Sequence, residues 1–179
     1  MFSKCTSLET VQDVLFAEET ALFPNICELM FKGCTSLKKA PALPSMKLNT
    51  ECYKGMFTGC TSLTEVPESL PATTLYESCY ENMFYGCTNL QKAPKLQAET
   101  LANSCYYYMF YGCSSLTEVW LNAVKNIDKG LPCTFNGCPS TGVTVHIRKD
   151  RDYKDIVSLL EQPYWNYVDI ETGELITEF

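Results

Sequence analysis

Histidine is almost absent from this sequence, since His146 is the only one in 179 residues. Basic residues are also a minority: 14 lysines and arginines stand against 21 aspartates and glutamates, for a formal net charge of −7. This balance argues against partners that select basic faces, namely nucleic acids and anionic membrane surfaces. No apolar run approaches the roughly 18–20 residues of a membrane-spanning helix, so no membrane insertion is expected. A secretory signal segment is not recognisable either.

The motifs of common catalytic and cofactor sites are missing as well. The sequence has no Cys-x-x-Cys pair, no Gly-x-Ser-x-Gly turn and no glycine-rich phosphate loop. Two acidic pairs, Glu65 with Glu68 and Asp150 with Asp152, fall in variable loops or at a helix start, where acids are favoured in any case. His146 falls at a polar position of an alternating segment and is expected to be an exposed strand residue. We therefore expect no enzyme activity, no metal and no cofactor.

The sequence is instead rich in one cysteine-containing octapeptide. Its five full copies read MFSKCTSL, MFKGCTSL, MFTGCTSL, MFYGCTNL and MFYGCSSL, and a shorter sixth copy reads TFNGC. The copies begin at residues 1, 30, 56, 83, 109 and 134, which gives a period near 26 residues. Self-similarity at such a period is typical of solenoids, in which each coil buries its apolar face against the next coil.

Alignment on the octapeptide gives columns of a single residue type. The phenylalanine column is Phe2, Phe31, Phe57, Phe84, Phe110 and Phe135, and the first cysteine column is Cys5, Cys34, Cys60, Cys87, Cys113 and Cys138. For each coil we predict a short helix, as at 77–86, with a glycine at its end. A short strand follows, as at 88–93, and a proline at 41, 67 or 94 ends it. The predicted fold is an α/β solenoid with coils of about 26 residues.

The last part of the chain departs from the repeat. Residues 142–148 (GVTVHIR) alternate apolar and polar side chains, which predicts a half-buried strand. A helix is expected over about 151–161, with Asp150 as its N-cap and Pro163 after its end. Two short strands are expected around 171–173. We therefore divide the chain into a repeat array of about six coils at 1–148, the first incomplete, and a C-terminal cap at 149–179.

These columns resemble the BspA-type leucine-rich repeats, a family with a β-strand followed by a motif like AFxGCxxL. The segments 56–67 (MFTGCTSLTEVP) and 109–119 (MFYGCSSLTEV) carry that signature. The segment 70–90 resembles a surface-repeat variant common in gut bacteria, and 152–170 resembles the usual C-terminal cap of such arrays. The resemblance covers about 1–148 and implies a leucine-rich-repeat array at the cell surface or secreted, which binds proteins or glycans, often in adhesion. It implies no catalytic residue.

The eleven cysteines could be core thiols, disulfides or metal ligands. Their odd number excludes complete internal pairing. A second column, Cys52, Cys79 and Cys105, has Ile26 and Gly130 at the corresponding positions of other coils. A position that accepts isoleucine indicates a buried apolar slot, in which a free cysteine behaves as a small hydrophobe. We favour stacked core thiols, with some disulfides as an alternative; a metal site is disfavoured.

The aromatic residues offer the best candidates for contact with a partner. Tyrosine follows the second cysteine column at 53, 80 and 106, and further aromatic residues gather in the fifth repeat. Because Cys105 and Met109 should point inward, Tyr107 and Tyr108 should point outward. Exposed tyrosine and tryptophan on a rigid surface are typical contact residues. The candidate partner-binding residues are Tyr85, Tyr107, Tyr108, Tyr111 and Trp120. The alternative is that these rings only seal the coils against one another.

Three functions remain after this reading. The first is a binding or adhesion module that presents a rigid repeat surface to a protein or glycan, as a monomer or as part of a larger chain. The second is a structural spacer in a longer array, because residue 1 already lies inside a repeat. The third, an enzyme, has only scattered acidic residues in its favour.

Overall fold

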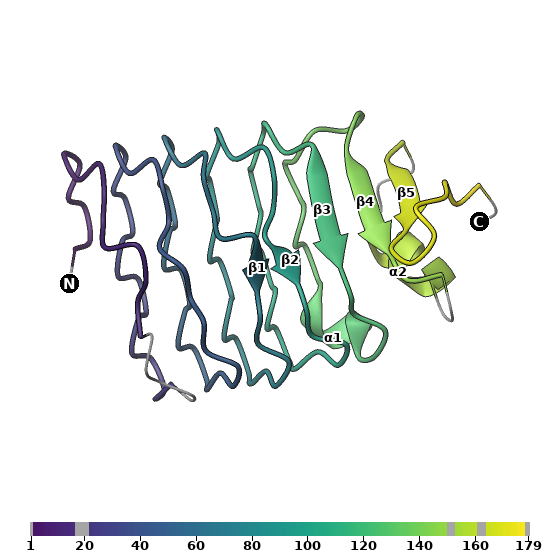
Figure 1. Ribbon diagram of the computed structural model, residues 1–179, viewed down its shortest axis with the longest axis horizontal. Coiled ribbons are helices and arrows are strands. Elements are labelled where there is room, and N and C mark those ends of the chain that lie inside the picture. The colour runs from purple at the N-terminus through teal and green to yellow at the C-terminus, as the bar shows by residue number, and fades with distance from the viewer. Residues whose placement is uncertain (1, 17–21, 150–152, 161–163, 178–179) are drawn as a thin grey trace.

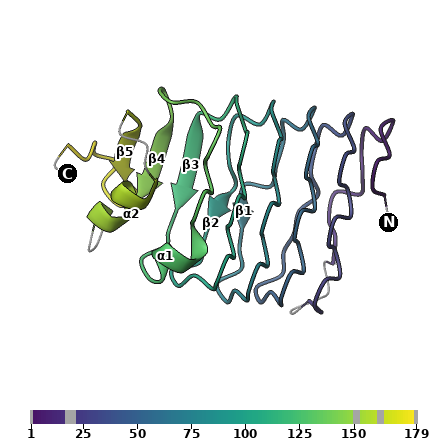
Figure 2. The same ribbon diagram turned by 180° about the vertical axis from the view of Figure 1, so that it is seen from behind.

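The computed structural model describes residues 2–16, 22–149, 153–160 and 164–177, and these form a solenoid of stacked coils (Figure 1). The two ends of the chain lie at opposite ends of the stack, as both views show (Figures 1 and 2). We number the coils 1 to 6 after the octapeptide that each contains. The elements are β1 (Ser69–Leu70), β2 (Lys95–Leu96), β3 (Glu118–Leu121), α1 (Ile127–Gly130), β4 (Thr144–Ile147), α2 (Tyr153–Leu160) and β5 (Asn166–Asp169).

One side of the solenoid, here called the sheet wall, is a parallel sheet with the strand order β1-β2-β3-β4-β5. Pairing is in register with the repeat, because Ser69 pairs with Lys95 and Glu118 with Thr144. Single parallel bridges, such as Lys39 with Glu65, extend the pattern to coils that have no full strand. In β3 and β4 every second side chain is buried, which fills the core from this side.

The other side, here called the turn wall, consists of the segments 25–33, 51–59, 78–86 and 104–112 of coils 2 to 5. The short helix predicted at 77–86 is wrong, since these residues form consecutive turns. Every fourth residue has a left-handed backbone: φ is +53° at Ser78, +55° at Asn82 and +69° at Gly86. A four-residue turn repeat gives buried positions the same spacing as a helix, and this similarity explains the error.

Backbone hydrogen bonds in the turn wall alternate between the coil itself and the next coil. The N–H groups of Glu81 and Met83 donate to carbonyls three residues back. Those of Tyr80 and Asn82 instead donate to the next coil, at 3.0 and 2.9 Å. In an α-helix, all interior N–H groups would donate to carbonyls of the same coil, and none would be available to the neighbouring coil. The turn wall therefore bonds neighbouring coils as a strand does.

The strand position within the coil also differs from the prediction. Residues 88 and 89 lie in a turn, pairing begins at the single bridge of Lys92 with Glu118, and β2 lies after Pro94. Proline thus precedes the strand and does not end it. Ala93 donates to the next coil and Lys95 to the previous one, so the ladder changes direction across Pro94. A residue without an N–H is tolerated at this change because no donor is needed there.

Two columns of aromatic rings run through the core beneath the turn wall. The six phenylalanines of the first column stack at centroid distances of 5.5–5.6 Å with interplanar angles of 5–9°. Tyr53, Tyr80 and Tyr106 form a second buried stack, at 5.8 and 5.9 Å. Offset stacking of this kind contributes about 0.5–1.5 kcal/mol per pair beyond burial. Stacked rings therefore bind each coil to the next inside the core.

The C-terminal segment continues the sheet. The predicted strand at 142–148 is confirmed as β4, and β5 pairs with it in parallel. The predicted helix is present as α2, although Asp150 and Pro163 lie outside the described residues. Of the two strands expected around 171–173, the first is β5 and the second is a single antiparallel bridge of Val168 with Leu175.

Trp165 closes the phenylalanine column at this end. Its ring meets the last ring, Phe135, edge to face at 5.5 Å, and its indole N–H donates to the Pro139 carbonyl at 2.8 Å.

We predict that the middle of the phenylalanine column is far more sensitive than its N-terminal end. Phe84→Ala removes a fully buried ring stacked on both sides and should lower the free energy of unfolding by about 3–5 kcal/mol. Phe2→Ala, whose ring is 43% exposed, should cost about 1 kcal/mol or less. Chemical denaturation measures both. Equal costs would contradict a core held together by the stack.

Candidate functional site

The first cysteine column makes thiol hydrogen bonds between coils. Cys60 Sγ donates to the carbonyl of Phe31, one coil earlier, at 3.2 Å, and that carbonyl also accepts the N–H of Cys34 at 3.1 Å. The buried carbonyl oxygen of Phe31 thus accepts two hydrogen bonds, one from the Cys34 N–H and one from the Cys60 thiol. Without the thiol, its second lone pair would have no donor. The same bond recurs in five coils, with Cys34, Cys60, Cys87, Cys113 and Cys138 as donors.

All eleven cysteines are free thiols in the structure, and eight of them are buried. Burial raises the pKa of Cys60 and of Cys105 to about 12 and that of Cys52 to about 11. A thiol with so high a pKa carries almost no thiolate at neutral pH, so these cysteines are poor nucleophiles. The argument from Ile26 was wrong in one respect, because that side chain is 39% exposed, whereas Cys52 is fully buried.

Trp120 lies on the sheet wall between two other side chains. Its ring stacks on that of His146 from β4 at a centroid distance of 3.6 Å and an angle of 7°. On the side of β2, the Lys95 ammonium lies 5.0 Å from the ring centroid, a cation–π contact. The indole is thus contacted from both neighbouring strands and is half-buried. The expectation that His146 is exposed is wrong, because its side chain is only 14% exposed beside Trp120.

An ion-pair chain flanks this stack. Glu118 accepts from Lys92 Nζ at 2.6 Å, and its other carboxylate oxygen lies 3.2 Å from His146 Nε2. The hydrogen bond from Lys92 lowers the pKa of Glu118, although partial burial opposes that shift. Lys95 pairs with Glu68 at 3.0 Å. Each carboxylate here thus has a cationic partner.

The other four predicted contact residues meet on the turn wall. Tyr85 and Tyr111 stack at 4.8 Å with nearly parallel rings, and Tyr108 meets both edge on, at 6.4 and 5.2 Å. Tyr107 packs against Tyr108 at 4.1 Å. We call these four residues the tyrosine cluster. Tyr85 is 37% exposed and the others are half-buried, so the cluster presents a continuous aromatic surface from coils 4 and 5.

Tyr108 has an unfavourable backbone conformation. Its φ of +53° is left-handed, which costs an L-residue roughly 1–2 kcal/mol. The corresponding residues of coils 3 and 4 are Gly55 and Asn82, which adopt this conformation readily, whereas coils 2 and 6 carry Leu29 and Cys133 in the same conformation. A hydrogen bond with Tyr107 raises the pKa of Tyr108 to about 12, so its phenol stays neutral.

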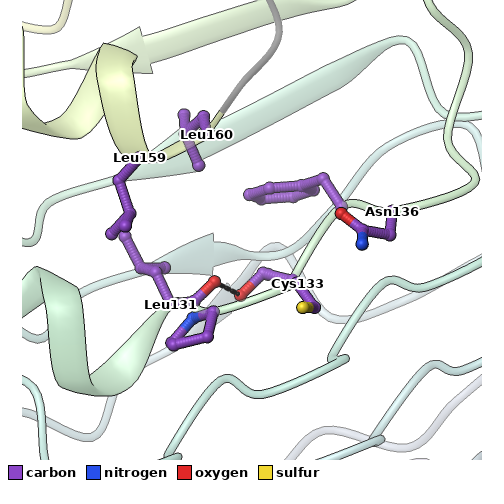
Figure 3. Close-up of a pocket in the computed structure, with 8 residues that line it drawn as sticks. Leu131, Cys133, Asn136, Leu159 and Leu160 are labelled. Carbon is purple, nitrogen blue, oxygen red and sulfur yellow. Dashed lines mark hydrogen bonds between the residues drawn. The ribbon is translucent and has the colours of Figure 1, made fainter.

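A hollow of about 180 Å³ lies between α2 and the segment 131–136 (Figure 3). Leu131 and Leu159 face one another across it, and Leu160 lies above. The Thr134 hydroxyl is committed to the carbonyls of Leu131 and Tyr106, at 2.6 and 2.8 Å. The hollow is thus mainly apolar and brings no set of reactive groups together.

Among the described residues, no group of three or more histidine, cysteine or acidic side chains could hold a metal ion. Within that same part of the chain, no helix is both long and apolar enough to span a membrane.

Sequence reasoning grouped the five candidate residues, but the structure separates Trp120 from the other four. It also missed the partners of Trp120, Lys95 and His146, because they come from neighbouring coils. The alignment of the repeats could have revealed these contacts, because Lys95, Trp120 and His146 fall at equivalent positions of successive strands.

Comparison with known proteins identifies the repeat. The family model described as BspA type Leucine rich repeat region matches in six copies, over residues 1–82 and 24–150. Its repeats are typically non-catalytic, suggest a protein-interaction or surface module, and are associated with bacterial surface proteins. No curated protein and no solved structure matches the chain.

We predict a graded reactivity of the thiols. Under native conditions, a maleimide should label the exposed Cys5 first and the partly exposed Cys133 and Cys138 more slowly, and the eight buried thiols should be protected. After denaturation without reductant, mass spectrometry should find all eleven labelled. Pairs that label only after reduction would show disulfides and contradict the structure.

Proposed function

The chain belongs to the BspA-type leucine-rich repeat family, and on this premise we propose that it is a non-enzymatic binding module whose tyrosine cluster contacts a protein or glycan partner. The observation that carries the proposal is the cluster itself, in which four tyrosine rings from coils 4 and 5 form one continuous and partly exposed aromatic surface. Glycine or asparagine, as in coils 3 and 4, would adopt the left-handed backbone of Tyr108 at less cost, although coils 2 and 6 also carry other residues there, Leu29 and Cys133. A tyrosine there gives up stability and gains an aromatic contact surface.

The composition of the cluster supports this function. Tyrosine provides a large, rigid contact area at a low cost in conformational entropy, and its hydroxyl can bond to a polar partner. The four rings also hold one another in place by stacking and edge contacts, so little order is lost on binding. Trp120 is not included in this surface, because it lies on the sheet wall between Lys95 and His146, away from the four tyrosines.

We further propose that the protein acts at the cell surface or in secreted form, with residues 1–148 as the repeat array and 149–179 as its cap. The arrangement of Trp165 at the end of the phenylalanine column is what such a cap requires.

The second candidate function is a structural spacer. The uniform stacking of the coils supports it, since a rigid rod can present another domain without binding anything itself.

A triple variant, Tyr107→Ala, Tyr108→Asn and Tyr111→Ala, tests the proposal. On arrays of glycans and purified extracellular proteins, the triple variant should bind the partners of the wild type about 30-fold more weakly or worse. This is the loss expected when hot-spot residues are removed. Tyr108→Asn alone should leave the free energy of unfolding within about 1 kcal/mol, because relief of the left-handed strain offsets the lost ring contacts.

Tyr164→Ala, at a tyrosine that is 73% exposed and lies outside the cluster, is the matched control and should bind as the wild type does. Undiminished binding by the triple variant would overturn the role of the cluster. If the wild type binds nothing on either array, the spacer is the better assignment.

A further inference from the structure

Two parallel rows of side chains run along the turn wall from coil to coil. The inner row consists of the left-handed residues Leu29, Gly55, Asn82, Tyr108 and Cys133. The outer row, three residues further along each coil, consists of Lys32, Thr58, Tyr85, Tyr111 and Asn136. In coil 3 both rows carry small residues, Gly55 and Thr58. A hollow of about 230 Å³ opens at that point, next to the tyrosine cluster.

The glycine is necessary for this hollow. A Cβ atom at residue 55 would come within 2.4 Å of Leu29 Cδ2 and within 3.3 Å of Thr58 Oγ1, and φ at this residue is +60°. Any larger residue at position 55 would thus displace the Leu29 side chain and fill the bottom of the hollow. The opposite side of the hollow is the ring of Tyr85. One face of that ring stacks on Tyr111 in coil 5, and the other faces coil 3 and the hollow.

Polar groups surround this aromatic face. Thr58 Oγ1 donates to the Asn82 carbonyl at 2.9 Å and keeps its lone pairs for a ligand. Lys54 lines the hollow and pairs with Glu51 and Glu81, at 2.6 and 3.3 Å.

Lys32, on the far side of the hollow, is exposed and has no ion-pair partner among the residues that the structure describes. Glu51 and Glu81 both pair with Lys54 and do not themselves line the hollow.

We propose that this hollow binds one uncharged pyranose ring of a glycan, stacked on the free face of Tyr85. The C–H groups on one face of a pyranose carry partial positive charge and pack on the negative face of an aromatic ring. Its hydroxyls lie around the ring edge, where the Thr58 hydroxyl, the Asn82 amide and the Lys32 ammonium can bond to them. The proposal rests on the proposed binding function and assigns its ligand class.

Size and polarity favour a sugar over an aromatic side chain of a protein partner. The hollow is smaller than the roughly 300–1,000 Å³ of pockets for drug-sized ligands, so it suits a single ring. An aromatic side chain would stack on Tyr85 equally well, but it would leave the polar groups at the rim without partners, which costs affinity. Lys54 is already ion-paired with two carboxylates and is not free for a sugar acid, which favours a neutral hexose or N-acetylhexosamine.

Saturation-transfer-difference NMR with four methyl glycosides tests the proposal: those of glucose, galactose, mannose and N-acetylglucosamine, each in the tens of millimolar. At least one should show transfer to the protons of one ring face, with an affinity in the millimolar range expected for so small a ligand. Tyr85→Ala should weaken that affinity tenfold or more. Thr58→Tyr should abolish transfer, because the added ring extends the Tyr111–Tyr85 stack and fills the hollow.

Thr64→Tyr adds the same side chain to an exposed position of the same coil outside the hollow and should leave transfer unchanged. Absence of transfer from all four glycosides, or transfer that persists in Thr58→Tyr, overturns the proposal.

Failure of this proposal can be told from failure of the proposed function. If no glycoside binds but Thr58→Tyr loses binding to an arrayed protein, the hollow takes a protein side chain. The sugar assignment then fails and the binding function stands. If glycosides bind as expected, the sugar assignment stands, and the triple variant on the arrays still decides the role of the tyrosine cluster. If the wild type binds neither the arrays nor the glycosides, both fail.

Discussion

The division of backbone N–H groups between each coil and the next is the constraint on which this fold depends. In the turn wall, alternate residues donate within their own turn and to the neighbouring coil. This alternation requires a left-handed residue at every fourth position, which glycine and asparagine supply at little cost. Gly137 illustrates the tightness of the stack, because a Cβ atom there would lie 3.3 Å from the backbone of Gly112.

The same constraint explains why the interior repeats and the exterior varies. Coils bonded in register bring each side chain against its own copy in the next coil, so one residue type can fill a whole column. Phenylalanine stacks on phenylalanine, and five of the six thiols of the first cysteine column donate to a carbonyl of the preceding coil. Outward positions carry no such requirement. Residues such as Thr58 and Tyr85 can therefore differ between coils without loss of the stack, and differences between them shape the surface available to a partner.

The columns were predictable from the sequence because repetition is visible without coordinates, and the family match agrees with them. Local structure within the coil was less predictable. Turns of four residues and an α-helix bury nearly the same positions, so periodicity could not separate them at 77–86. Proline was assigned to the end of the strand, whereas Pro94 precedes β2 at a point where the ladder needs no donor. For the candidate site, adjacency in sequence did not give adjacency in space: Tyr106 is buried, whereas Tyr107 and Tyr108 reach the surface.

By itself, the sequence determined the solenoid, its period and the thiol and phenylalanine columns, because these follow from identical residues at a fixed spacing. Only the tertiary structure decided which aromatic residues meet. Contacts across coils join residues about 26 positions apart, and the wall to which each belongs depends on where the chain turns. That geometry places Tyr85 beside Tyr111, covers Trp120 with His146, and leaves a hollow over Gly55.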